Sequence, residues 1–187
     1  MENLIDKYSR LETPNLILRK ARLTDLDSIY NNVWSSTSLN KYMFWETTLT
    51  KEDALKRLLR TIQFQSNHFE YFICDKKTDE AIGFAGMELF QDNVYSEIGI
   101  CLAEKYQHCG YGKEVLGALE KLAFDELKGE RFLYGFLEGN VPSMKLCISM
   151  GFKYLDTQKR IRERDQRIFN KICYYLDKET YEKENII

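Results

Sequence analysis

The sequence predicts a single domain of the α+β (mixed α/β) class, spanning residues 1–187. Three observations predict it. Apolar residues make up 44% of the chain and aromatic residues 13%, which suits a folded core rather than disorder. Strand-like and helical runs follow one another in the order β-α-α-β-β-β-α-β-α-β-β. Neither a repeat nor a linker rich in Gly, Ser or Pro interrupts that order, so we expect one domain.

Two helices and four strands are expected in the first part of the chain. The helices begin at Thr24 and Thr50, because each threonine precedes apolar residues at helical spacing. The strands are runs of apolar and β-branched residues, at 16–22, 71–75, 81–90 and 94–102. The polar residues 91–93 join the last two of these strands as a hairpin.

The second part of the chain alternates helices and strands. A long helix is expected over 112–127, whose leucines fall on one face. A strand over 132–137 separates it from a shorter helix, which begins at Asn140 and ends at Gly151. Proline in the first turn and glycine after the last turn are typical helix boundaries. The final two strands are expected at 152–155 and 168–176.

The stretch Gln-His-Cys-Gly-Tyr-Gly-Lys, from Gln107 to Lys113, is the most informative one in the chain. It joins a strand to a helix, where backbone N–H groups have no intrahelical acceptor and the helix dipole adds partial positive charge. Such a turn predicts a phosphate cradle. A Walker A loop is disfavoured because Glu114 stands where Ser or Thr is needed, and a dinucleotide fingerprint because Val115 stands where Gly is needed.

The pattern that fits is Gln/Arg-x-x-Gly-x-Gly/Ala, filled by Gln107, Gly110 and Gly112. It resembles the acyl-CoA loop of the GNAT superfamily of N-acyltransferases. Other segments resemble the branch that acetylates ribosomal-protein N-termini, spermidine and related amines: Thr13–Arg19, Ala81–Gly86, Glu97–Ile100, Asn140–Ser143 and Met150–Phe152. The resemblance runs from about Leu11 to Leu176. It implies the GNAT fold, a mostly antiparallel mixed sheet of six to seven strands flanked by about four helices.

The resemblance also implies an activity. It is that of an N-acetyltransferase that moves an acetyl group from acetyl-CoA, the co-substrate, to a primary amine by direct attack in a ternary complex, without a metal. The amine acceptor is a protein N-terminus or a small molecule. The alternative is a non-catalytic acyl-CoA-binding regulatory module that keeps the phosphate cradle.

The cofactor contacts fall in three places. Backbone N–H groups of residues 110–113 are expected to hold the pyrophosphate. Gln107 is expected to fix the loop or to bond the pantetheine region, and Lys113 to add charge or to lie in solvent. In the family, pantetheine pairs with the exposed edge of the fourth strand. The expected cofactor-binding residues are Ile100, Cys101 and Leu102 on that edge, Gln107, His108, Cys109, Gly110, Tyr111, Gly112 and Lys113 in the loop, and Asn140 and Ser143 at the later helix.

Two acidic residues are candidates for the general base. A primary amine with a pKa near that of lysine (about 10.4) is protonated at neutral pH, so a carboxylate must attract it and take its proton. Glu97 is the first candidate, because family members often use an acid at this strand, and Glu88 is the second. An outward-facing strand acid that pairs with a neighbouring base is the competing interpretation.

One position departs from the family pattern. Many GNAT enzymes have a tyrosine four residues before the Gly of Gly-Phe, as the acid for the leaving thiolate, but this chain has Cys147. A CoA thiol can leave as thiolate and take a proton from water, and Ser143 and Tyr111 are alternative donors. An acceptor pocket could be lined by Trp34, Tyr42, Phe44 and Trp45, although aromatic residues are more often part of a core. The charged run 159–167 is interpreted as a solvated hairpin or as a surface that steers an anionic ligand.

Composition excludes several classes. With a net charge of −2 and a pI of about 5.8, nucleic acid is not an expected partner. No apolar run approaches the roughly 18 residues of a membrane span, and Met1–Lys7 lacks the pattern of a signal peptide, so we expect a cytoplasmic protein. The five cysteines and two histidines form no metal-binding pattern. A homodimer is left open.

Overall fold

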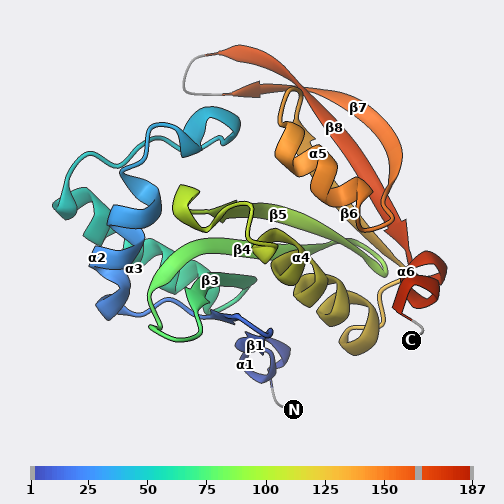
Figure 1. Cartoon of the computed structure of the whole chain (residues 1–187), viewed down its shortest axis with the longest axis horizontal. Helices are drawn as coiled ribbons and strands as arrows, with labels where there is room; N and C mark the ends of the chain where they lie inside the picture. The colour runs from blue at the N-terminus through green and yellow to red at the C-terminus, as the bar shows by residue number, and fades with distance from the viewer. Residues whose placement is uncertain (1–2, 163–165, 186–187) are drawn as a thin grey trace. The chain divides into compact units, whose positions relative to one another are not determined.

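The computed structural model describes residues 3–162 and 166–185, with the side chain of residue 185 excepted. The chain forms two compact units (Figure 1). The first unit comprises Met1–Glu88 and Ile98–Leu119, and the second Leu89–Glu97 and Glu120–Ile187. Strand β5 (Val94–Leu102) and helix α4 (Tyr111–Lys121) each contribute residues to both units.

The first unit is built on antiparallel strands. Its strand order is β1-β2-β3-β4-β5. Four strands precede β5 in the chain: β1 (Arg10–Glu12), β2 (Leu16–Arg19), β3 (Phe69–Asp75) and β4 (Ala81–Gln91). All four residues of β2 are buried, which suits an apolar strand covered on both faces.

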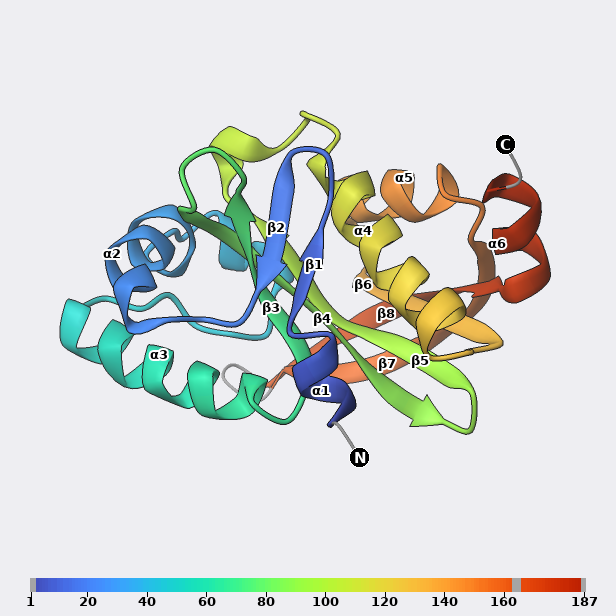
Figure 2. The ribbon, with the colours of Figure 1, turned by 90° about the horizontal axis from the view of Figure 1, so that it is seen from below.

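Helices α2 (Leu26–Ile29) and α3 (Lys51–Gln65) lie side by side in this unit, as Figure 2 shows. Thr50 is the N-cap of α3, since its side chain accepts from the Asp53 N–H at 3.1 Å. Ala54 and Leu58 face inward from α3 and join one core with Ile17 and Phe72. This core therefore lies between the two helices and one face of the strands. The short helix α1 (Leu4–Lys7) precedes β1.

The second unit continues from β5 to three further strands in the order β5-β6-β8-β7. These are β6 (Arg131–Leu137), β7 (Lys153–Arg162) and β8 (Arg167–Asp177). β5 and β6 run parallel, joining Val94 to Arg131 and Ser96 to Leu133, whereas β8 is antiparallel to both of its neighbours. Helix α5 (Val141–Ile148) packs on β6, and helix α6 (Lys178–Asn185) follows β8.

The fold class expected from the sequence is confirmed, and the described residues form eight strands in place of six to seven. The extra strand is β1, whose polar sequence Arg-Leu-Glu carries no alternating apolar pattern. Two terminal helices, α1 and α6, were also not predicted. β7 runs to Arg162 rather than ending near 155, so the charged run largely forms strand ends, except for residues 163–165, which lie outside the described residues.

Candidate active site

The predicted phosphate loop is fastened to the end of β5. The Gln107 side-chain amide donates to the Leu102 carbonyl oxygen at 2.9 Å, and the Gln107 N–H donates to the Glu104 carbonyl at 3.1 Å. The side chain of Gln107 is therefore used inside the protein. It orients the turn that follows, which is the loop-fixing role expected of this residue.

The turn depends on left-handed backbone at two positions. His108 has a φ of 61° and Gly110 a φ of 85°. A Cβ built on Gly110 would meet no heavy atom within 4 Å, so the outer side of the turn is open. Glycine is favoured at 110 by its conformation and not by crowding.

The first turn of α4 narrows the set of N–H groups that could hold a ligand. The Lys113 and Glu114 N–H groups both donate to the Gly110 carbonyl, at 3.0 and 3.3 Å. Tyr111 and Gly112 are the first residues of the helix, and a helix has no internal acceptor for such N–H groups. The Lys113 N–H is already used inside the protein, so it is not part of the cradle expected over 110–113. The Lys113 side chain is exposed.

Glu114 holds the start of this helix against β2. Its carboxylate accepts from the Thr13 hydroxyl at 2.6 Å, and from the Asn15 side-chain amide at 2.7 Å and N–H at 3.1 Å. Burial raises the pKa of Glu114, but these hydrogen bonds outweigh it and leave the pKa lowered. The Thr-Pro-Asn turn before β2 therefore positions the helix start.

The predicted pantetheine edge of β5 lies close to β4. Cys101 and Leu102 are buried and Ile100 is half-buried. A Cβ on Gly83 of β4 would overlap the Cys101 carbonyl oxygen, so glycine is needed for the two strands to approach. Burial raises the pKa of Cys101 to about 12, and this thiol stays neutral at physiological pH.

The two candidate bases differ in environment. Glu97 is only 9% exposed, whereas Glu88, on β4, is exposed. Both residues stay predicted bases, and so does the competing interpretation of a strand acid that pairs with a neighbouring base. Burial, and then the charge of Glu97, raise the pKa of Tyr134, a buried tyrosine of β6. Sequence reasoning missed Tyr134 because a tyrosine in an apolar strand is typical of a core.

The residues expected at the later helix, α5, make contacts within the protein. The Asn140 side chain caps α5 by accepting from the Ser143 N–H at 3.3 Å. Burial raises the pKa of the nearby Tyr134, and Ser143 lowers it in part. Cys147 is fully buried, its thiol donates to the Met144 carbonyl at 3.3 Å, and burial raises its pKa to about 11. Such a thiol is poorly suited to protonate a leaving thiolate of lower pKa.

Two of the aromatic residues expected around the acceptor, Trp34 and Trp45, lie beside the side chain of Arg57. The guanidinium of Arg57 lies 4.6 Å from the ring centre of Trp34 and 4.8 Å from that of Trp45. Trp34 is buried and meets Phe72 edge-on. Burial lowers the pKa of Arg57 to about 10. Trp34 is thus a core residue, whereas Phe44 is 49% exposed.

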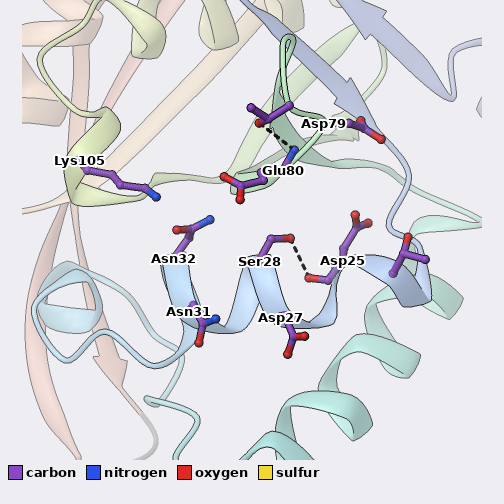
Figure 3. A pocket seen from close by; sticks show the side chains of 10 residues that line it. Asp25, Asp27, Ser28, Asn31, Asn32, Asp79, Glu80 and Lys105 are labelled. Carbon is purple, nitrogen blue, oxygen red and sulfur yellow. Dashed lines mark hydrogen bonds between the residues drawn. The ribbon is translucent and has the colours of Figure 1, made fainter.

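A polar hollow of about 570 Å³ lies in the first unit, between the start of α2 and the β3–β4 turn (Figure 3). Its acidic residues are largely neutralised. Asp25 and Asp79 pair with Arg19, both at 2.8 Å, and Asp27 pairs with Lys51 at 2.7 Å. None of the expected site residues lines it.

The described residues contain neither a candidate metal site nor a helix suited to span a membrane. Across residues 3–162 and 166–185, no three His, Cys, Asp or Glu side chains are grouped so as to hold a metal ion. Within the same ranges, none of the helices combines the length and apolar character that a membrane span requires.

Comparison with known proteins gives the family. A family model described as an acetyltransferase (GNAT) domain matches residues 15–153. The chain is 26% identical over 174 residues to an uncharacterized N-acetyltransferase, p20, of Bacillus licheniformis, covering 91% of this chain and 97% of that protein.

Solved structures share the fold. The ribosomal-protein-S5-alanine acetyltransferase of Vibrio fischeri matches with a TM-score of 0.73 at 17% identity, over 92% of this chain and 98% of that one. The microcin C7 self immunity acetyltransferase MccE, in complex with acetyl-CoA and AMP, matches with a TM-score of 0.79 at 14% identity, over 94% and 99%. Because the family model covers most of its length, the chain is an acetyltransferase that belongs to the GNAT family.

Proposed function

We propose that this enzyme transfers the acetyl group of acetyl-CoA to a primary amine by direct attack in a ternary complex. GNAT acetyltransferases use acetyl-CoA and act on amine acceptors, and the particular acceptor is what the proposal adds. The observation that carries the proposal is the burial of Glu97 on β5, within the strand that resembles the family's fourth.

The loop residues would bind the diphosphate. The N–H groups of Tyr111 and Gly112 are unused by the helix, and the positive end of the α4 dipole adds to their attraction for an anion. The Gly110 turn leaves its outer side open for approach. Ile100 to Leu102 would pair with the pantetheine amides through their backbone, so their side chains need only fit.

Glu97 would act as the base. The ammonium form of the acceptor loses a proton to the Glu97 carboxylate, and the amine nitrogen then attacks the thioester carbonyl carbon. The C–N bond forms and the C–S bond breaks. The nitrogen then loses its second proton, and the sulfur, which leaves as a thiolate, takes up one proton through water. Glu88 is exposed and is the second candidate.

The acceptor class we favour is a free amino terminus of a peptide. The support is the structural likeness to an enzyme whose name states ribosomal-protein-S5-alanine acetylation. Polyamines and other small amines are the competing acceptors.

The test is a thiol-release assay with acetyl-CoA and a panel of amines that includes a peptide with N-terminal alanine, spermidine and an aminoglycoside. The proposal predicts amine-dependent release of CoA and a product heavier by one acetyl group. Binding of CoA with no release for any amine would instead favour a regulatory acyl-CoA-binding module.

A further inference from the structure

The polar hollow of Figure 3 has walls that are fastened to each other. The Ser28 hydroxyl donates to the Asp25 carbonyl at 3.0 Å and accepts from the Ala81 N–H at 3.3 Å. The Asn32 side-chain amide donates to the Ala81 carbonyl at 2.9 Å. These hydrogen bonds tie α2 and the residues after it to the start of β4. The hollow is therefore formed before a ligand arrives, as is typical of small-molecule sites.

Most of the negative charge around the hollow is balanced within the protein. Asp25, Asp27 and Asp79 each form an ion pair with an arginine or a lysine that does not line the hollow. Two lining charges are left, the Glu80 carboxylate and the Lys105 ammonium. Among residues 3–162 and 166–185, neither has a hydrogen bond or an ion pair. The hollow thus offers a ligand one anion and one cation.

These two charges come from different parts of the chain. Glu80 ends the β3–β4 turn, and Lys105 lies in the short 3₁₀ helix η4 (Glu104–Tyr106). Figure 3 shows both side chains, together with that of Asn32, turned toward the same space. Because the Asn32 nitrogen is used by the Ala81 carbonyl, its amide oxygen remains an acceptor. A ligand can therefore meet two acceptors and one cationic donor in this hollow.

We propose that the hollow binds a small zwitterion, an amino acid or a short peptide, whose carboxylate pairs with Lys105 and whose ammonium pairs with Glu80. The volume of about 570 Å³ falls within the range of roughly 300–1,000 Å³ that is typical of small-molecule sites. A ligand with a single charge would leave one of the two groups without a partner. A ligand that engages both groups makes the second contact without a second loss of translational freedom.

The proposed ligand is separate from acetyl-CoA. None of the residues predicted to bind acetyl-CoA or to act as the base lines the hollow. The inference therefore does not depend on the proposed function, and CoA should not displace the ligand.

An NMR titration of ¹⁵N-labelled protein, with and without CoA, tests the proposal. The probes are the unbranched amino acids from glycine to 6-aminohexanoate, which hold their two charges at increasing separation, and the peptide triglycine. At least one probe should give saturable shifts at the Glu80 and Lys105 amides. Butyrate and butylamine carry one charge each and should bind at least about tenfold more weakly, because each lacks one charge-assisted contact.

Matched variants assign the binding to the two charges. Glu80→Gln and Lys105→Gln should each weaken binding of the best probe by about tenfold. The controls are Glu104→Gln, next to Lys105, and Lys77→Gln in the β3–β4 turn. Both remove the same charges from exposed residues that do not line the hollow, and both should bind the probe as wild type does.

The absence of saturable shifts with every probe would overturn the proposal, and so would displacement of the bound probe by CoA. Butyrate or butylamine that binds as well as the best probe would refute recognition of both charges. Equal losses in the lining variants and their controls would refute the assignment to Glu80 and Lys105. Thermal unfolding of each variant separates these outcomes from a failure to fold.

Discussion

At the residue scale, Glu97 is a carboxylate that the fold largely shields from water. It is 9% exposed on β5, directly after Ser96, which pairs with Leu133 of β6. A buried carboxylate that must receive a proton is suited to general base chemistry. Its amide analogue keeps the shape of the side chain but cannot take a proton.

We therefore expect Glu97→Gln to lower kcat by about 10²-fold or more, with the KM for acetyl-CoA little changed. Steady-state CoA release at several acetyl-CoA concentrations measures both constants. Glu88→Gln tests the second candidate in the same assay; Glu88 is exposed on β4, so this variant should retain most of the activity. Similar rates for wild type and Glu97→Gln would remove Glu97 as the base.

Individual residues differed in how far the sequence predicted them. The Gln107–Gly112 pattern predicted a glycine turn before a helix, and the turn has that form because Gly110 needs its positive φ. Trp34 was expected at an acceptor pocket, but it is a core residue beneath the Arg57 guanidinium. Composition alone cannot distinguish these two roles, because both require a large aromatic ring.

The pairing of β5 with β6 could not be predicted. Its register, and the way α5 packs on β6, are tertiary facts that leave no local sequence signal. The loop residues stay predicted cofactor contacts, and so do Asn140 and Ser143.

At the element scale, the Glu114 side chain holds the start of α4. In the sequence, Glu114 served only as evidence against a Walker A loop. The Glu114 carboxylate accepts three hydrogen bonds from Thr13 and Asn15. These contacts tie the helix to the turn before β2. A carboxylate in the first turn also suits the helix dipole.

The Glu114→Ala variant should be destabilised by about 1 kcal/mol at pH 7, a value that allows for the partial exposure of these groups. The lowered pKa fixes the sign of the pH dependence: the stabilisation is present above pH 4.5 and is lost as the pH falls through the folded-state pKa. Urea unfolding at pH 7 and at pH 3.5 measures both effects. A wild type and variant that differ equally at the two pH values would contradict this role.

Most elements followed from the sequence because their signals are local. The β5 strand was predicted with its observed bounds, Val94–Leu102, and the N-cap of α3 at Thr50 was also correct. Elements at the ends of the chain were missed. β1 and α1 have three and four residues, too few for a periodic pattern, and α6 is polar with no buried apolar stripe predicted from its sequence.

At the scale of the whole molecule, one buried charge site controls how stability depends on pH. Glu120 is 4% exposed, its Oε1 finds no hydrogen-bond partner among the described residues, and Glu184 adds a like charge. Burial, and then Glu184, raise its pKa from 4.5 to about 8.

The sign of the effect follows from proton binding. Between pH 4.5 and about 8, folded Glu120 holds a proton that the unfolded chain has released. The free energy of unfolding should therefore fall by about 1.4 kcal/mol per pH unit over this window. Glu120→Gln should remove that slope and be more stable than wild type at pH 8, by on the order of 4 kcal/mol. Chemical denaturation from pH 5 to pH 8.5 measures the free energy of unfolding of each protein, and Glu182→Gln on α6 is the control. Wild type and Glu120→Gln whose free energies of unfolding change in parallel with pH would contradict the assignment.

The family and the mixed α/β fold were predictable because many weak signals agreed along the chain. A single domain, a cytoplasmic location, a homodimer and the peptide amine acceptor stay predictions. None of them follows from local patterns, because each depends on surfaces or partners that one chain does not specify.

The central claim is that the loop at the start of α4 grips the diphosphate of coenzyme A. Titration of ¹⁵N-labelled protein with CoA, and separately with pantetheine, which has no diphosphate, tests it most directly. CoA should move the amide resonances of Gly110, Tyr111 and Gly112 strongly, while pantetheine should leave them in place. Loop resonances that ignore CoA, or that respond equally to pantetheine, would contradict the account.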